Sequence, residues 1–241
     1  MPDHVILGKL TRREFRDALE SGKYQTGVIP IGSIEQHIEH LAMEHDTASV
    51  SHVAEEAARR LYPQVIVTVP MNVGISEHHM VHKGTVTAKP GSWLSVLFDA
   101  AESLARHGVK NILLLNGHGG NVRPVDGIID QWRLFFKVQH PDVTLAFTSY
   151  WDLMRDDVVL GQMTTDHYPG HAQEFETAFA LALWPENVRP DAMKDQKDKE
   201  PLEATAETGK ILVEEAISQT ADFLERFIKG EIDVNNPSHH P

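Results

Sequence analysis

Residues Val28–Thr47 read VIPIGSIEQHIEHLAMEHDT, and the interpretation of the whole chain starts from them. This stretch opens with a short apolar run, residues 28–31, that is typical of a buried β-strand, and the strand ends at Gly32-Ser33. In open α/β sheets, ligands bind beyond the carboxyl ends of the strands. Polar side chains able to build such a site follow at once: Glu35, Gln36, His37, Glu39, His40, Glu44, His45 and Asp46.

The donors in this stretch suit a divalent metal ion. Carboxylate oxygens and imidazole nitrogens are ligands for zinc, manganese and iron. Glu35 and His37 are two residues apart, so in extended backbone both face the same side and can reach one ion. Asp46 returns after a loop, from where it could bridge two ions. The alternative is a solvated polar loop, and a second group of donors after another strand argues against it.

That second group follows the clearest buried strand of the chain. Residues 111–116, NILLLN, are apolar on both faces, as strands of a parallel sheet are. They lead into Gly117-His118-Gly119-Gly120-Asn121, where glycines let the backbone approach a ligand and a helix start can hold an anion. We therefore expect His118, Gly119 and Gly120 to lie at the same site.

The rest of the chain alternates between strands and helices. Hydrophobic periodicity predicts further strands at 64–69 and 143–150, and helices at 12–21, 48–61, 93–107, 121–138, 171–183 and 204–229. Residues 191–203 are dense in charge and are interpreted as an exposed loop. This alternation predicts an α/β fold with a mostly parallel sheet. No composition shift marks a boundary, so we expect one domain over residues 1–241.

Composition limits the classes of function. The chain has 241 residues, 41% of them hydrophobic, and a formal charge of −13, which disfavours nucleic acid and anionic membranes as partners. It has no cysteine, which excludes disulfides and thiolate metal sites and is compatible with the cytoplasm. We find no signal peptide pattern at the start and no apolar run long enough to cross a bilayer, so a cytoplasmic location is expected.

Two later segments add candidate residues. The loop at 72–85 carries three histidines, and we expect its part Glu77–His82, which includes His78, to contact substrate or a neighbouring subunit. Trp151, just after the strand at 143–150, is a further candidate for substrate binding. His171 and Glu174 are three residues apart and would share one face of a helix, whereas Glu176 would point elsewhere.

Together these motifs resemble the creatininase (creatinine amidohydrolase) family. The resemblance spans most of residues 27–184 and rests on the order and spacing of its parts. Those parts are Gly32-Ser33-x-Glu35-Gln36-His37, Asp46, Asn116-Gly117-His118-Gly119-Gly120-Asn121 and His171-Ala172-x-Glu174-x-Glu176-Thr177.

The resemblance implies a three-layer α/β/α fold, two divalent ions (Zn²⁺, Mn²⁺ or both, with Fe²⁺ possible) and a homo-oligomer, often a hexamer. Glu35 and His118 would bind one ion, His37 the other, and Asp46 both, with His171 as the catalytic histidine. Creatininase itself has a ligand glutamate at the position of Gly120. We therefore expect Glu174 to supply the missing carboxylate, with Glu176 as its competitor.

The activity implied is hydrolysis of a small, often cyclic, C–N bond by a metal-bound hydroxide, with His171 passing a proton to the leaving group. Other members of the family act on a formamido pyrimidine, on a peptide, or on a cyclic diketone derived from inositol. Cleavage of a C–C bond in such a dehydro-inosose is therefore the main alternative. An isomerase or aldolase, and a non-catalytic small-molecule binding protein, are more remote alternatives.

Overall fold

The fold is built on four parallel strands, and the computed structural model describes it over residues 4–234. The strand order is β2-β1-β3-β4, and every pairing is parallel. The strands are β1 (Thr26–Ile31), β2 (Val65–Val67), β3 (Asn111–Asn116) and β4 (Thr144–Ser149). The helices are α1 (Arg12–Glu20), α2 (His45–Arg60), α3 (Pro90–His107), α4 (Gly119–Asp126), α5 (Ile129–Gln139), α6 (Tyr150–Leu153), α7 (Asp156–Leu160), α8 (Glu174–Leu183), α9 (Pro190–Asp195) and α10 (Ala206–Ile228). Short 3-10 helices cover Leu7–Lys9, Glu77–His79, Pro185–Asn187 and Glu200–Glu203.

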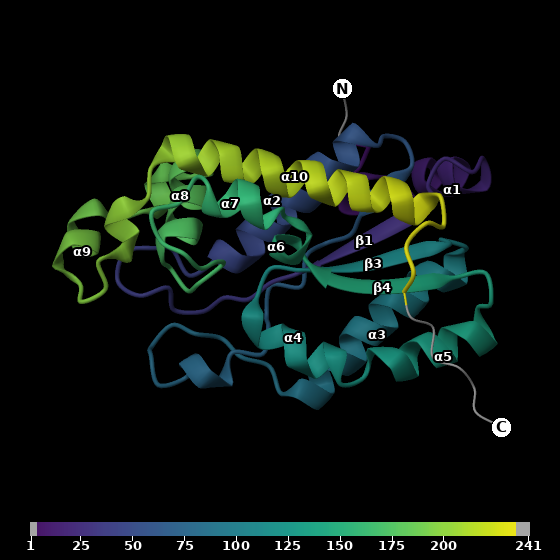
Figure 1. Ribbon diagram of the computed structural model, residues 1–241. Helices are drawn as coiled ribbons and strands as arrows, with labels where there is room; N and C mark the ends of the chain where they lie inside the picture. The colour runs from purple at the N-terminus through teal and green to yellow at the C-terminus, as the bar shows by residue number, and fades with distance from the viewer. Residues whose placement is uncertain (1–3, 235–241) are drawn as a thin grey trace.

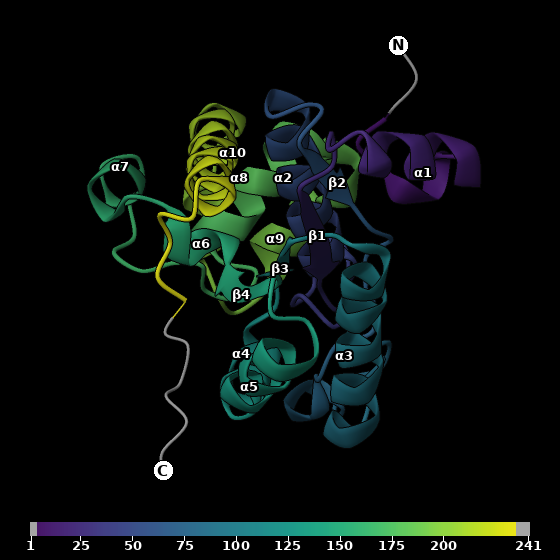
Figure 2. The same cartoon turned by 90° about the vertical axis from the view of Figure 1, so that its right-hand side faces the viewer.

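Helices cover both faces of the sheet, which confirms the three-layer α/β/α arrangement. Helices α2, α8 and α10 lie on one face, and α3, α4 and α5 on the other (Figures 1 and 2). Successive side chains of a strand point to opposite faces. In β3, accordingly, Leu113 and Leu115 pack in the core beneath α2 and α10, whereas Ile112 and Leu114 pack beneath α3 and α5. The apolar run of β3 therefore serves two cores at once.

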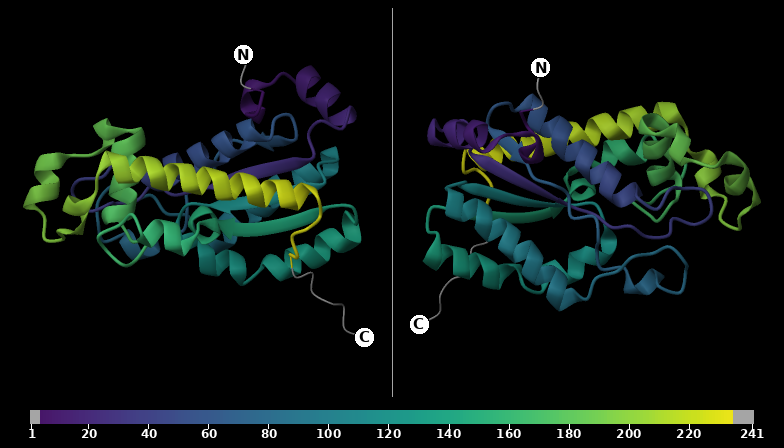
Figure 3. Two further views of the ribbon diagram at one scale, coloured as in Figure 1. Left: turned by 45° about the horizontal axis from the view of Figure 1, so that its top comes forward. Right: turned by 180° about the vertical axis from the view of Figure 1, so that it is seen from behind.

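The strand order reverses between β1 and β3. From β1 the chain crosses through α2 to β2 on one side, and then through α3 to β3 on the other side of β1. Open α/β sheets bind ligands at the point where successive strands are added on opposite sides of the first strand in this way. Ile31, Asn116 and Ser149 are in register, so these strands end together. Their arrowheads point toward the end of the molecule that carries α8 and α9 (Figure 3).

Three expectations for local structure need correction. The predicted helix at 121–138 is two helices, α4 and α5, because α4 contains Pro124 and ends at Gly127. The segment expected to be a charged loop contains α9 and a 3-10 turn, since charged residues also suit the exposed face of a helix. Helix α8 begins at Glu174 rather than at residue 171, because Ala172 has φ +52° and cannot be helical.

Within residues 4–234, no helix is both long and apolar enough to span a membrane.

Candidate metal centre

Two glycines let helix α2 pack directly on the ends of β1 and β3. A Cβ built at Gly32 would lie 2.5 Å from the Thr47 Cα, and one at Gly117 would lie 2.6 Å from the Asp46 carbonyl oxygen. Only glycine allows so close an approach of two backbones. As a result Asp46, in the first turn of α2, lies beside the residues that follow both strands.

The Asp46 carboxylate lies between two histidines. Its Oδ1 is 3.1 Å from His37 Nε2, and its Oδ2 is 2.9 Å from His118 Nδ1. Glu35 Oε1 is 3.5 Å from the same His118 nitrogen. All four side chains are buried. The structure thus brings together the four metal ligands expected from the sequence after β1 and β3.

The far ring nitrogen of each of these two histidines contacts a main-chain carbonyl. His37 Nδ1 is 3.0 Å from the Glu35 carbonyl oxygen, and His118 Nε2 is 3.1 Å from that of Ile75. A carbonyl oxygen only accepts, so each of these nitrogens donates its hydrogen. The nitrogen that faces Asp46 is then the one that gives up its hydrogen when a metal ion binds, which is the arrangement of a metal-binding histidine.

A second carboxylate reaches His37 from helix α8. Glu176 Oε2 lies 3.7 Å from His37 Nε2 and accepts a hydrogen bond from the Ala172 N–H. The expectation that Glu174 would fill this place is wrong, because its carboxylate accepts hydrogen bonds from the main-chain N–H groups of Thr164 and Thr165. A helix that began at His171 would point both carboxylates in other directions about its axis, and α8 begins only at Glu174.

Three histidines line one side of the centre. His171 Nδ1 and His79 Nε2 each lie 3.6 Å from Glu35 Oε1, and their rings stack with centroids 4.4 Å apart. His78 has a ring nitrogen within reach of Glu35 and His118. The histidine loop after β2 therefore lies against the residues of the centre, although the sequence singled out His78 rather than His79.

The glycine motif after β3 is tightly packed at one position and open at the next. A Cβ at Gly120 would lie 2.2 Å from the Ile75 carbonyl oxygen and 3.0 Å from the His78 ring, whereas one at Gly119 would meet nothing within 4 Å. The space at Gly120 is therefore filled by the loop after β2, and not by a side chain from α8. Trp151 packs against the core beneath α10, beside Tyr150.

Some donors of the opening stretch lie outside the centre. Glu39 and Glu44 are exposed. His40 is buried but contacts Thr177 and Gln196 through its two ring nitrogens, 2.9 and 3.2 Å from their side-chain oxygens. These contacts tie the loop after β1 to α8 and to the segment after α9.

The pKa values of the buried groups are shifted by burial and by the carboxylates that lie close together in the centre. Burial lowers the pKa of His37, but the Asp46 carboxylate outweighs burial and raises it to about 10. Burial raises the pKa of Glu176 to about 8, and burial followed by the charge of Asp46 also raises the pKa of Glu35. Burial lowers the pKa of His171 to about 3, and His37 and His79 act in the same direction. Bound cations would take the place of the protons on His37 and Glu176.

The donor set fits divalent metal ions. Among the described residues, Glu35 Oε2 and Asp46 Oδ2 are buried without a hydrogen-bond partner, which is costly unless a cation satisfies them. Several groups of three side chains have ligand atoms within 4.8 Å of one another: Glu35, His37 and Asp46; Glu35, His78 and His118; His37, His171 and Glu176; and Glu35, His79 and His171.

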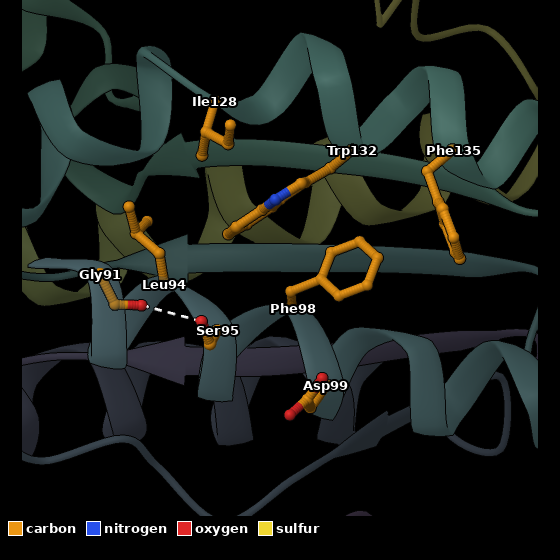
Figure 4. A pocket seen from close by; sticks show the side chains of 8 residues that line it. All are labelled: Gly91, Leu94, Ser95, Phe98, Asp99, Ile128, Trp132 and Phe135. Carbon is orange, nitrogen blue, oxygen red and sulfur yellow. Dashed lines mark hydrogen bonds between the residues drawn. The ribbon is translucent and has the colours of Figure 1, made fainter.

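An apolar groove lies elsewhere, between α3 and α5. Phe98 and Trp132 lie inside it with ring centroids 5.5 Å apart, and Phe135 is at one end (Figure 4). No carboxylate or histidine of the metal centre lines it. The groove is therefore separate from the site described above.

Both the family model and the similar proteins of known function point to one protein family. The family model described as "Creatininase: Creatinine amidohydrolase" matches residues 8–204. The creatinine amidohydrolase of Pseudomonas putida is 29% identical over 205 residues, 81% of this chain and 78% of that protein. A 3-dehydro-scyllo-inosose hydrolase of Thermotoga maritima is 28% identical over 201 residues, 82% of this chain and 62% of that protein.

Solved structures agree with the sequence comparisons. A crystal structure of creatinine amidohydrolase superposes with a TM-score of 0.81 at 25% identity, covering 92% of this chain and 97% of that one. Two further creatininase structures at 25% identity, each with a TM-score of 0.79 and covering 92% of this chain and 98% of theirs, are described as a Zn-Zn type mutant and as a Mn form. The chain belongs to the creatininase family and is a metal-dependent hydrolase.

Proposed function

We propose that the protein binds two divalent ions, Zn²⁺ or Mn²⁺, and uses them to hydrolyse the C–N bond of a small, cyclic amide. The observation that carries this proposal is the Asp46 carboxylate, whose two oxygens face His37 and His118. One ion would be held by Glu35, His118 and Asp46, and the other by His37, Asp46 and Glu176. The ion next to His37 then obtains the carboxylate that Gly120 cannot supply.

When bound, such ions lower the pKa of a coordinated water and polarise a substrate carbonyl. The chain itself would position the substrate. His171 is the proposed catalytic histidine, because its half-buried ring faces Glu35 from the open side of the centre. The N–H groups of Gly119 and Gly120 begin α4 beside His118 and would bind a substrate oxygen. His78 and Trp151 are proposed substrate contacts.

The direct test compares metal-loaded and metal-free protein with creatinine as the first cyclic amide. We expect turnover with zinc or manganese, a product that has gained one water, loss of turnover after chelation and recovery on adding metal back. An Asp46→Asn variant keeps the shape of the side chain but removes the shared charge, and should lose both ions. Turnover that survives complete removal of metal would contradict the proposal.

A second candidate is hydrolysis of a C–C bond in a cyclic ketone. It is favoured by the similarity to the inosose hydrolase and by Gly120, where this chain departs from the creatininase pattern. The same assay with 3-dehydro-scyllo-inosose separates the two candidates, since only one of the two rings should be opened.

Residues 1–241 would form one catalytic domain, because α10 packs on α8 and α2 over the sheet. We also propose that the protein is a homo-oligomer, a hexamer by resemblance to the family, and that it is located in the cytoplasm. Sedimentation of the metal-loaded protein tests the assembly.

A further inference from the structure

The side chain of Gln36 lies between two histidines at the edge of the metal centre. Its Nε2 is 2.8 Å from His171 Nε2 and 2.8 Å from His79 Nδ1, while its Oε1 accepts the Ile38 N–H at 2.9 Å. The backbone N–H can only donate, so the amide oxygen must face Ile38. The two hydrogens of the amide nitrogen are therefore directed at the two rings.

This arrangement fixes where the hydrogens of both rings lie. An amide NH₂ group only donates, so His171 Nε2 and His79 Nδ1 must accept and carry no hydrogen. Each ring is then neutral, and its hydrogen is on the opposite nitrogen, His171 Nδ1 or His79 Nε2. Both of these nitrogens lie 3.6 Å from Glu35 Oε1, where an N–H is attracted to the carboxylate and a lone pair would be repelled.

The histidines of the site thus fall into two classes. His37 and His118 donate from their outer nitrogens to carbonyl oxygens, so their inner nitrogens present lone pairs once a metal ion takes the place of a hydrogen there. His79 and His171 accept at their outer nitrogens from Gln36 and present N–H groups inward. A lone pair can bind a metal ion, whereas an N–H group binds a hydrogen-bond acceptor.

We propose that Gln36 is a positioning residue that holds His79 and His171 as neutral N–H donors facing the metal centre, so that neither binds metal. Its functional meaning rests on the proposed two-metal hydrolase. Two of the four possible metal-binding groups, those that include His171, are thereby excluded, which leaves ligands for two ions. A substrate atom that contacts the inner nitrogens of His79 and His171 must then accept hydrogen bonds, as a carbonyl or carboxylate oxygen does.

The proposal is tested by ¹⁵N NMR of zinc-loaded protein labelled at histidine, with the His171→Gln and His79→Gln variants used to assign the two rings. We expect His171 to have its hydrogen on Nδ1, the less common tautomer of histidine, and His79 to have it on Nε2. Gln36→Glu replaces the donor with an acceptor of the same shape, so both rings should reverse. Gln131→Glu, on the exposed side of α5, adds the same charge elsewhere and should change neither ring.

Metal content gives a second readout. Wild-type protein and the two histidine variants should each bind two zinc ions per chain, whereas Gln36→Glu turns lone pairs inward beside Glu35 and should bind a third. A wild-type His171 with its hydrogen on Nε2, or loss of one ion in either histidine variant, would overturn the proposal. Both readouts are independent of turnover, so a wrong substrate in the creatinine assay leaves them intact. Metal-free protein that fails to bind zinc would instead contradict the proposed function.

Discussion

Glu174 and Glu176 lie two residues apart in α8, and different partners hold their carboxylates. Glu174 satisfies the N–H groups of a turn at Thr164 and Thr165, whereas Glu176 reaches the Ala172 N–H and His37. The first contact stabilises a loop and the second completes a cluster of metal-type donors. Residue type and spacing alone do not distinguish these two roles.

We therefore expect Glu176→Gln to retain one zinc ion and to lose or weaken the second, since an amide is a poor ligand. Glu174→Gln is the matched control and should keep both ions. It should lower the free energy of unfolding by about 1.5–3 kcal/mol, the usual value for a hydrogen bond to a charged group. Elemental analysis and thermal unfolding of the two variants measure these effects. Loss of an ion in Glu174→Gln alone would restore the original assignment.

The protons held by the metal-free centre predict a pH dependence of metal binding. With pKa values raised to about 10 for His37 and about 8 for Glu176, both groups are largely protonated at pH 7. A metal ion requires both to be deprotonated. Zinc binding at pH 7 should therefore release protons, and affinity should rise with pH until these groups have titrated. Calorimetry in buffers of different ionisation enthalpy measures the release, and heats that do not depend on the buffer would contradict it.

At the scale of elements, the start of α4 is fixed by its contact with the loop after β2. A Cβ at Gly120 would collide with the Ile75 carbonyl oxygen, which also accepts from His118. We expect Gly120→Ala to displace this loop, to weaken zinc binding, and to destabilise the protein by about 1–3 kcal/mol, as overpacking does. Gly119→Ala meets open space and should be neutral or slightly stabilising. Zinc titration and thermal unfolding of the pair check this, and equal effects of both substitutions would refute the steric argument.

At the scale of the whole molecule, the long helix α10 holds α8 in place over the sheet. A Cβ at Gly209 would lie 1.9 Å from the Ala178 carbonyl oxygen, so the two helices approach at backbone distance. The Gly209→Ala variant should push α10 away from α8, lower the free energy of unfolding by about 1–3 kcal/mol and reduce zinc affinity through Glu176. Gly91→Ala, in the open first turn of α3, is the control. Unfolding and zinc titration of both variants test whether α10 supports the centre, and an unchanged zinc affinity in Gly209→Ala would argue that it does not.

The α/β fold, the family and the donors that follow β1 and β3 could all be inferred from the amino-acid sequence. These features are local: an apolar run buried on both faces makes a parallel strand, and whatever follows it must emerge at the edge where ligands bind. Glu35, His37 and His118 can be identified as candidate ligands from the strands that directly precede them. The start of α1 is equally local, because Thr11 and Glu14, three residues apart, form a capping box there.

Which carboxylate reaches His37, and which side chains Gln36 contacts, depend on how distant parts of the chain pack together. Ala172 has a left-handed backbone conformation, so α8 can begin only after it, at Glu174. The start of the helix sets the directions in which Glu174 and Glu176 point. Gln36 meets His79 and His171, which lie 43 and 135 residues away along the chain. The sequence gives the type of each side chain. Its hydrogen-bond partners depend on how distant backbone segments pack, which a local sequence pattern does not predict.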